Sequence, residues 1–282
     1  MILIMSNTQN YLLVKEQIKN ADWILIWAWA WLSTSAWLQY WDKWFSENFP
    51  ELVENYWMTD FYTSSFYDFE TEEERWSYRS KHIDFLYNKP ALPLYKNIFE
   101  LIKNKDYFVL STNVDGQFLH AWFDKNKVFE IQWSLSKMQC SRACHNKLYD
   151  TLELVDKLKE YRKEIRIPTE FIPYCPNCWE KMELNLRKDR YFVEDNHWHK
   201  LNDNYSKFIE YYKDKKLLLI EFWVGYNTPW IIRYPFESMT YSFPDTRFIR
   251  VNADYSDIPK ELEWKAIWFN DDCWKFVQEV LH

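Results

Sequence analysis

The stretch ADWILIWAWAWLSTSAWLQY, residues 21–40, decides the fold that the sequence predicts. Its apolar run WILIW, residues 23–27, is typical of a strand buried on both faces of a parallel sheet. Polar residues from Ser33 to Ser35 then indicate the start of a helix. Between them stands Trp-Ala-Trp-Ala-Trp, where the turn of an α/β protein usually needs glycine. The stretch therefore predicts the first strand, turn and helix of an α/β sheet, with an unusual turn.

Strand and helix patterns alternate along most of the chain, which predicts a doubly wound parallel sheet. Further strands are predicted at YFVLST, KVFEI, KLLLIEF, RFIRV and KAIWF, and helices at residues 10–19, LYKNIFELIKNK, DGQFLHAWF and from Asp271 onward. Residues 47–88 are predicted to be mostly helical, and a charged, cysteine-bearing stretch at residues 136–212 interrupts the alternation. We therefore expect a sheet domain made of residues 1–46, 95–135 and 215–282, and a smaller domain made of residues 47–94 and 136–214.

Composition excludes several classes of function. The chain of 282 residues has a formal net charge of -7 and a pI near 5.5, which disfavours general binding to nucleic acid. It has no apolar run of about 18 residues, so we expect no membrane span. Residues 1–17 turn polar too early for a secretory signal. We expect a cytoplasmic protein.

Glycine and tryptophan are present in unusual amounts, with 2 and 18 residues respectively. An average chain has about 7% glycine, which supplies the positive φ angles of tight turns and helix ends. In this chain tryptophan stands where such turns are predicted, in AWAW, HAWF, IQWS, CPNCWEK, EFWVGYNTPW and CWKF. Trp76 and Trp198 lie outside these turns and are typical packing residues. The pattern indicates that tryptophan has replaced glycine at the turns.

Four cysteines form two close pairs that predict a metal site. Cys140 and Cys144 are separated by three residues, and Cys175 and Cys178 by two. Two such pairs about thirty residues apart suit a tetrahedral zinc ion with four thiolate ligands, which leaves no position open for catalysis. The alternatives are four unrelated buried or free cysteines, or disulfides, which a reducing compartment disfavours. Cys273 is predicted to be a small core residue of the last helix.

Polar residues follow two neighbouring predicted strands. Asn113, Asp115, Gly116 and His120 lie in STNVDGQFLHA, and Gln132 lies in EIQWS. Ligands of doubly wound sheets bind outside the carboxyl ends of the strands, so these residues are candidates for a site. The alternative is that the Asx residues only cap a helix and that Gln132 is a solvated strand end.

These stretches together resemble the sirtuin family, from about residue 20 to the end of the chain. WAWAWLSTSAW resembles the sirtuin Gly-Ala-Gly loop, TNVDGQFLHAW resembles the Gln-Asn-x-Asp segment, and the four cysteines match the zinc ribbon. The resemblance implies a Rossmann-like sheet domain, a smaller zinc-ribbon and helical domain, and NAD held between them. The residues it assigns to NAD binding are Ala28, Trp29, Ala30, Ser33, Asn113, Asp115, Gly225, Asn252 and Cys273.

Departures from the family pattern change the activity that the resemblance implies. Deacylating sirtuins carry His-Gly where this chain has Gln132 and Trp133, and a glutamine amide cannot act as their histidine base. The chain is similar in this respect to the macrodomain-linked branch, class M. That branch implies a protein ADP-ribosyltransferase that modifies a lipoylated carrier resembling the glycine-cleavage H protein, with a macrodomain hydrolase as partner. The implied catalytic residues are Asn113, Asp115, Gln132 and Arg187, although Arg187 also suits a solvated charge.

Two alternative functions stay open. One is an NAD-dependent protein deacylase in which Gln132 positions water, and the other is a catalytically dead module that binds NAD or ADP-ribose. A separate expectation concerns the tryptophans, because Trp27 and Trp29 stand where the family has glycines that let the backbone approach a pyrophosphate. We therefore expect the function of the glycine-bearing pattern, and we expect that a chain with these indoles does not bind NAD.

Overall fold

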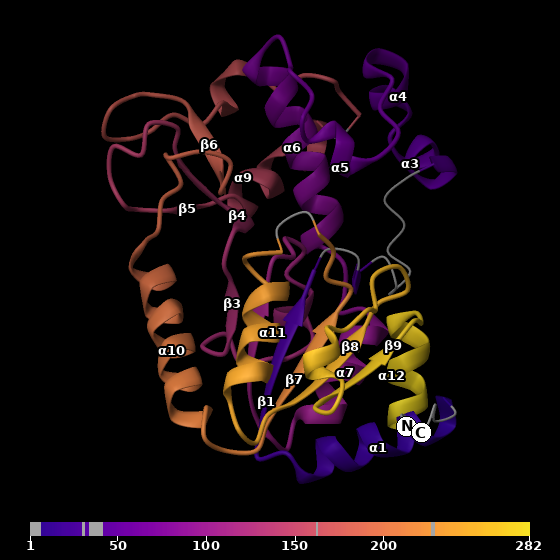
Figure 1. Cartoon of the computed structure of the whole chain (residues 1–282). Coiled ribbons are helices and arrows are strands. Elements are labelled where there is room, and N and C mark those ends of the chain that lie inside the picture. Colours follow the sequence, from indigo (N-terminus) through magenta and orange to yellow (C-terminus); the bar gives the residue numbers. More distant parts are fainter. Residues whose placement is uncertain (1–6, 30–31, 34–41, 162, 227–228) are drawn as a thin grey trace.

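The structure, a computed structural model, describes residues 7–29, 32–33, 42–161, 163–226 and 229–282 (Figure 1). Two regions stacked on each other make up this part of the chain. One contains a six-stranded sheet in the order β3-β2-β1-β7-β8-β9, and the other a three-stranded sheet in the order β5-β4-β6. The predicted site residue Ala30 and most of the helix predicted from Ser33 lie outside the described residues.

Every pairing in the larger sheet is parallel, as the alternating sequence pattern predicts. Its central strands are buried on both faces, which explains their continuous apolar runs. The strands are β1 (Trp23–Ala28), β2 (Asp106–Ser111), β3 (Val128–Glu130), β7 (Leu217–Phe222), β8 (Arg247–Val251) and β9 (Ala266–Phe269).

Helices cover both faces of this sheet (Figure 1). Alternate residues of a strand point to opposite faces, so β2 contributes Val109 to one core and Leu110 to the other. The first core is closed by α1 (Asn7–Asn20), α7 (Pro93–Ile102) and α12 (Cys273–Leu281), and the second by α10 (Asn196–Tyr212) and α11 (Arg233–Ser242). The sheet with both layers of helices is the predicted doubly wound α/β arrangement.

The smaller region has an apolar core of its own, which includes Phe61, Trp76, Leu135 and Met182. Its antiparallel sheet consists of β4 (Trp133–Cys140), β5 (Tyr149–Asp150) and β6 (Met182–Leu186). Its helices are α3 (Asp42–Asn48), α4 (Pro50–Tyr56), α5 (Phe61–Ser64), α6 (Glu72–Tyr87) and α9 (Leu152–Lys157). Short 3-10 turns lie at Leu158–Tyr161, Thr169–Phe171 and Lys260–Leu262.

Helix α6 joins the smaller region to the end of the large sheet. A capping box begins it, because Thr71 accepts from the Glu74 N–H and Glu74 accepts from the Thr71 N–H. Its last residue, Tyr87, lies against the turn after β2, where a Cβ added at Gly116 would be 3.0 Å from the Tyr87 ring. Gly116 has φ +65°, so this turn needs both the small size and the conformational freedom of glycine.

Two elements differ from the sequence expectation. Helix α10 was placed with the smaller domain, yet its Leu201, Phe208 and Tyr212 pack into the second core of the large sheet. Figure 1 shows α10 beside β3. The helix packs there because its buried apolar residues form one face, which needs an apolar partner. The helix predicted over DGQFLHAWF is only the four-residue α8 (Gln117–His120).

Four tryptophans adopt a left-handed backbone. Trp57, Trp122, Trp179 and Trp223 have φ of 57°, 69°, 59° and 56°. Among the described residues other than glycine, Ala143 alone shares this conformation. A positive φ is strained for a bulky side chain and easy for glycine. These four turns therefore have the geometry that glycine normally provides.

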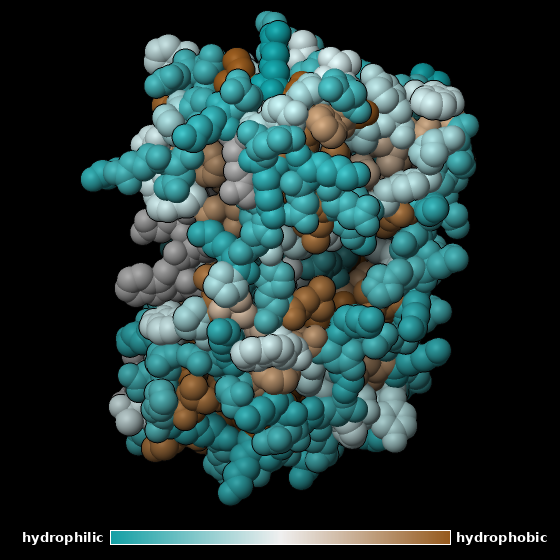
Figure 2. All heavy atoms as spheres, turned by 180° about the vertical axis from the view of Figure 1, so that it is seen from behind, coloured by the Kyte–Doolittle hydropathy of each residue, from teal (hydrophilic) through white to brown (hydrophobic). Residues whose placement is uncertain are grey.

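The surface is mostly hydrophilic on the face seen in Figure 2, where apolar groups appear as separate patches. Within the described ranges, no helix combines the length and the apolar character that a bilayer crossing requires.

Candidate functional site

The strand order of the large sheet places its switch point between β1 and β7. From β1 the chain proceeds outward to β2 and β3 on one side, and β7, β8 and β9 follow on the other side. The connections therefore diverge between β1 and β7. Doubly wound sheets bind ligands at the carboxyl ends of the strands at this point.

A hydrogen-bonded cluster lies at the carboxyl ends of β1 and β2. The Ser33 hydroxyl bonds to the Asp115 carboxylate and, at 2.5 Å, to the Tyr95 hydroxyl. The Asn113 side-chain amide donates to the same Tyr95 hydroxyl at 2.9 Å. The Gln117 N–H donates to Asp115 at 3.0 Å. All five residues are buried. The structure thus brings together Ser33, Asn113 and Asp115, which the sequence proposed as site residues.

Tyr95 is a member of this cluster that sequence reasoning missed. It lies on α7 beside Leu94 and near Ile98, which both belong to the apolar core. A phenolic hydroxyl on the buried face of an amphipathic helix needs a polar partner. This requirement could have indicated that Tyr95 belongs to a polar cluster, but the sequence does not show which group the hydroxyl bonds to.

Several buried polar atoms of the site have no hydrogen-bond partner among the described residues. They are Asn113 Oδ1, Gln117 Nε2, His120 Nδ1 and Thr112 Oγ1. Buried polar groups are nearly always hydrogen-bonded, because leaving one unsatisfied costs about 1–3 kcal/mol. Their concentration after β2 is the pattern expected where a polar ligand completes the network.

Three ionisable groups near the cluster have pKa values above their usual range. Burial raises the pKa of the Asp115 carboxyl, against the opposing effect of the Ser33 and Gln117 hydrogen bonds. Burial and then the Asp115 charge raise the pKa of Glu130 to about 8. Burial, followed by the Glu130 charge, raises the pKa of Tyr87. Such perturbed groups concentrate at functional sites.

Gln132 and Arg187 are neighbours through their backbones. Gln132 follows β3, is buried, and accepts a hydrogen bond from the Arg187 N–H at 2.9 Å. The Arg187 guanidinium pairs with Glu194 at 2.5 Å and lies 4.4 Å from the centre of the Phe192 ring. The structure therefore places Arg187, which directly follows β6, beside Gln132, with its charge directed to an acidic partner.

The turns after β7 and β8 are tied together by Asn252. Its side-chain amide donates to the Val224 carbonyl at 3.0 Å, and its oxygen accepts from the N–H groups of Asp254 and Tyr255. Gly225 lies in the first of these turns. Cys273 is fully buried in the core at the start of α12, which confirms its prediction as a core residue.

Two buried arginines hold the loop that follows Asn252. Arg250 forms a bidentate pair with Glu221 at 2.7 and 3.0 Å, and both side chains are fully buried. Arg250 and Arg233 also donate to the Asp257 carbonyl at 2.6 and 2.9 Å. Sequence reasoning missed this pair, because arginine and glutamate within strands give no local sign of each other.

Tryptophans lie near the end of β1 and in the turn that follows it. Trp27 is buried and stacks on Phe236 of α11, with ring centres 4.5 Å apart. The Trp29 indole contacts the turn after β7, since a Cβ added at Gly225 would be 2.8 Å from its ring. An indole from the β1 turn therefore reaches the β7 turn at the point where the connections diverge. Ala28 is buried beneath it at the end of β1.

The four paired cysteines converge in the smaller region. Cys140 and Cys178 have sulfur atoms 3.5 Å apart, Cys144 and Cys175 have theirs 3.6 Å apart, and all four sulfurs lie within 4.8 Å of one another. Four thiolates at about 2.3 Å from a tetrahedral zinc ion have sulfur atoms about 3.8 Å apart. The cluster fits a structural zinc ion, as the spacing predicted, and the Trp179 turn with its positive φ directly follows it.

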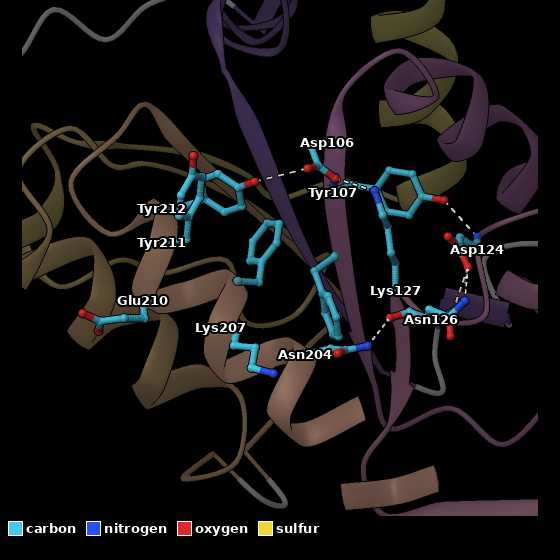
Figure 3. A pocket seen from close by; sticks show the side chains of 12 residues that line it. Asp106, Tyr107, Asp124, Asn126, Lys127, Asn204, Lys207, Glu210, Tyr211 and Tyr212 are labelled. Carbon is cyan, nitrogen blue, oxygen red and sulfur yellow. Dashed lines mark hydrogen bonds and ion pairs between the residues drawn. The ribbon is translucent and has the colours of Figure 1, made fainter. Parts of the chain in front are cut away.

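A hollow opens at the opposite ends of the strands, between the start of β2 and α10 (Figure 3). Several of its polar side chains are engaged in hydrogen bonds or ion pairs. Asp106 pairs with Lys127 and accepts from the Tyr212 hydroxyl at 3.2 Å, and Asn204 donates to the Asn126 carbonyl at 3.2 Å. The hollow contains none of the predicted site residues.

Comparison with known proteins agrees with this description. No known family profile matches the chain. A protein ADP-ribosyltransferase of Staphylococcus aureus is 31% identical over 282 residues, which cover 99% of this chain and 90% of the relative. A probable bifunctional ADP-ribose hydrolase/ADP-ribosyltransferase of Fusarium oxysporum is 27% identical over 245 residues, covering 80% of this chain and 39% of that protein.

Solved structures give the class of fold. Sir2Tm bound to a propionylated peptide matches with a TM-score of 0.58 at 16% identity, covering 98% of both chains. A Sir2 homologue mutant in complex with ADP-ribose also matches with a TM-score of 0.58, at 12% identity over 98% of this chain and 95% of the other. The fold is therefore the Rossmann-like fold of the Sir2 proteins. The chain belongs to the family of the Staphylococcus aureus protein ADP-ribosyltransferase and has the Sir2 fold.

Proposed function

We propose that the chain is a sirtuin-type, NAD-dependent protein ADP-ribosyltransferase of the class M branch. The observation that carries this proposal is the buried cluster of Ser33, Asn113 and Asp115 at the strand ends, with unsatisfied polar atoms beside it. The name of the Staphylococcus aureus relative supports the activity. The position of the cluster at the switch point of the sheet supports a nucleotide ligand.

The residues of the site suit NAD. The unsatisfied Asn113 Oδ1 and Gln117 Nε2 offer an acceptor and a donor for the nicotinamide end, and Asp115 is held in place by two hydrogen bonds. Asn252 and Gly225, in the turns after β8 and β7, suit the adenosine end. When bound, NAD supplies an ADP-ribosyl group joined to nicotinamide as leaving group.

Gln132 favours transfer over deacylation. It occupies the position that a histidine base occupies in the deacylating sirtuins, and an amide has no pKa useful for proton transfer. It can still orient a ribose or an acceptor by hydrogen bonding. Arg187, whose N–H bonds to the Gln132 carbonyl, is well placed to contact the acceptor protein.

The substrate and partner follow from the class M assignment. We infer that the acceptor is a lipoylated carrier protein similar to the glycine-cleavage H protein, and that a macrodomain hydrolase removes the mark. The name of the Fusarium oxysporum relative combines an ADP-ribose hydrolase with an ADP-ribosyltransferase, which supports the pairing of the two activities.

We further infer that the active form of the protein carries glycine at its turns, and that a chain with the indoles does not bind NAD. The positive φ angles at four tryptophans support the first statement. The contact of Trp29 with the Gly225 turn supports the second, because the indole lies where a pyrophosphate needs direct access to backbone N–H groups.

The first experiment is the intact mass of the purified, metal-free chain, compared with 35.1 kDa. A clearly lower mass that matches glycine at the turns supports the inference about glycine, and 35.1 kDa contradicts it. The protein is then incubated with labelled NAD and a carrier with or without lipoyl groups. We expect label only on the lipoylated carrier. Acyl-ADP-ribose formed from an acyl-lysine peptide would instead identify a deacylase, and binding without nicotinamide release a dead module.

A variant pair tests the cluster itself. Asn113→Ala removes the amide that bonds to Tyr95 and should abolish labelling while the protein stays folded. Asn55→Ala changes an exposed asparagine of α4 and should label the carrier at the wild-type rate. Equal labelling by both variants would contradict a role of Asn113 in transfer.

A further inference from the structure

The four cysteines of the zinc site differ in their exposure to water. Cys140 and Cys175 are fully buried, whereas Cys144 and Cys178 are exposed. Four thiolates carry more negative charge than a Zn²⁺ ion neutralises, so the sulfur atoms gain from hydrogen-bond donors. The protein shields a buried sulfur from water and competing ligands, but it does not shield an exposed one. Loss of zinc should therefore begin at the exposed pair.

One of the two exposed sulfurs has a histidine directly beside it. The Nδ1 atom of His145 lies 3.1 Å from the Cys144 sulfur and 3.9 Å from the Cys175 sulfur. On the other side of the ring, the Nε2 atom lies 3.0 Å from the Tyr149 hydroxyl. Tyr149 begins β5, which pairs with β4, the strand that ends in Cys140. The imidazole therefore bridges the sulfur cluster and a residue of the small sheet.

The chemistry of these groups determines where the imidazole carries its proton. A thiolate has no proton to donate, so the Nδ1 atom of His145 carries hydrogen and donates it to the Cys144 sulfur. The Nε2 atom of the neutral ring is then an acceptor, and it accepts from the Tyr149 hydroxyl. One chain of hydrogen bonds thus leads from Tyr149 through His145 to Cys144.

The geometry makes His145 a donor to sulfur and not a fifth ligand. A tetrahedral zinc ion with a sulfur at about 2.3 Å and a nitrogen at about 2.0 Å keeps these two ligand atoms about 3.5 Å apart. The 3.1 Å between Nδ1 and the Cys144 sulfur is shorter than this and suits a hydrogen bond to a charged acceptor. The four sulfurs, which all lie within 4.8 Å of one another, already supply the ligands of a structural site.

We propose that His145 is a positioning residue of the zinc site, which holds the exposed Cys144 thiolate on the ion and thereby strengthens the binding of zinc. Its N–H group offsets part of the thiolate charge, and the Tyr149 hydroxyl keeps the ring in the tautomer that donates. This role concerns the zinc ion and is independent of the proposed transfer activity.

Zinc affinity, measured by competition with a chromophoric chelator, tests this role without NAD or a carrier protein. His145→Ala removes the donor and should bind zinc about 10- to 100-fold more weakly than the wild type. Tyr149→Phe leaves the donor but removes the group that fixes its tautomer, so its affinity should be intermediate. His197→Ala, at an exposed position of α10, should match the wild type. Wild-type affinity in His145→Ala would overturn the proposal.

His145→Asn separates the hydrogen bond from the general effect of a substitution. The amide nitrogen of asparagine stands as many bonds from the backbone as the Nδ1 atom of histidine, so it can donate to the same sulfur. This variant should keep most of the wild-type affinity for zinc. If His145→Asn and His145→Ala lose zinc affinity equally, donation to the sulfur is not the cause and the proposal is wrong.

Cobalt substitution adds a spectroscopic test that a merely structural role would not affect. Co²⁺ bound by thiolates absorbs through charge transfer from sulfur to metal, and a hydrogen bond raises the energy of this absorption because it stabilises the sulfur lone pair. The band should therefore move to longer wavelength in His145→Ala, and by less in Tyr149→Phe. It should stay in place in His145→Asn and His197→Ala. An unshifted band in both His145→Ala and Tyr149→Phe would contradict the hydrogen bond to sulfur.

Discussion

Single residues of this site hold one another in position. Tyr95 links Ser33 to Asn113 through one hydroxyl, and Ser33 in turn holds Asp115. A network in which each member is fixed by another keeps its side chains in place before a ligand arrives. Gln132 is buried just after β3. The four polar atoms without partners are then the ones left for the ligand.

His82 gives a prediction about stability at acid pH. It is buried in α6 and stacks on Phe61 with ring centres 4.5 Å apart, and burial lowers its pKa to about 3. Below pH 6.5, the usual pKa of histidine, His82 is protonated in the unfolded chain but stays neutral in the folded chain. The free energy of unfolding should therefore decrease as the pH falls from about 6.5 toward 3, by about 1.4 kcal/mol for each pH unit.

Urea denaturation at several pH values measures this slope. His82→Gln should lose it, because glutamine does not titrate. His197→Gln, at an exposed position of α10, should keep the slope of the wild type. An unchanged slope in His82→Gln would show that other groups cause the acid sensitivity.

At the scale of elements, turns carry the main anomaly of this chain. Trp57 ends α4 with φ 57° and ψ 29°, its N–H bonds to the Val53 carbonyl, and its side chain is 88% exposed. This is the geometry of a helix C-terminus that glycine normally closes. The indole contributes little packing there, so backbone strain should dominate the effect of a substitution.

Paired substitutions separate backbone strain from lost packing. Trp57→Gly and Trp57→Ala remove the same indole, yet the glycine variant should be more stable by about 1 kcal/mol because of the positive φ. At Trp76, inside α6, the order should reverse by a similar amount, since alanine is the better helix former. Thermal or chemical unfolding of the four variants checks both signs. The same order at both sites would argue against strain at Trp57.

The zinc knuckles are the second element-scale prediction. We expect one zinc ion per chain, and its removal by a chelator should lower the unfolding midpoint, because the ion ties β4 to the Cys175 turn. Cys175→Ser should weaken retention of zinc. Cys273→Ser, a cysteine buried in a different core, should keep the full zinc content. Zinc content measured by atomic absorption decides between a metal site and four free thiols.

Much of the fold could be predicted from the sequence, and the reasons are local. WILIW and KLLLIEF form β1 and β7 because apolar runs of this length need burial on both faces. The spacing of the four cysteines predicted the metal cluster, which is also a local signal. Helix α10 was assigned to the smaller region although it packs on the large sheet. The sequence of an amphipathic helix shows its apolar face but does not show which surface that face packs against. Tyr95 was missed for a related reason, since its partners Ser33 and Asn113 are distant in sequence.

At the scale of the whole molecule, the contact between the β1 and β7 turns should control nucleotide binding. Trp29 bridges these turns by contacting Gly225, and it does so where the sheet connections diverge. A nucleotide must approach the backbone of both turns to use their N–H groups. The Trp29 indole and the pyrophosphate therefore compete for the same space. This one side chain should decide whether the β1 and β7 turns can bind a nucleotide together.

Trp29→Gly should restore binding of NAD to a chain confirmed to carry the indoles. In thermal unfolding, NAD at 100 times its dissociation constant should stabilise the variant by about 2.7 kcal/mol and leave the indole-bearing chain unchanged. Trp264→Gly changes an exposed tryptophan before β9, at the opposite ends of the strands, and should not confer binding. Saturable binding by the unmodified chain would contradict the prediction. It would mean that the β1 turn moves the indole aside at a cost smaller than the binding energy.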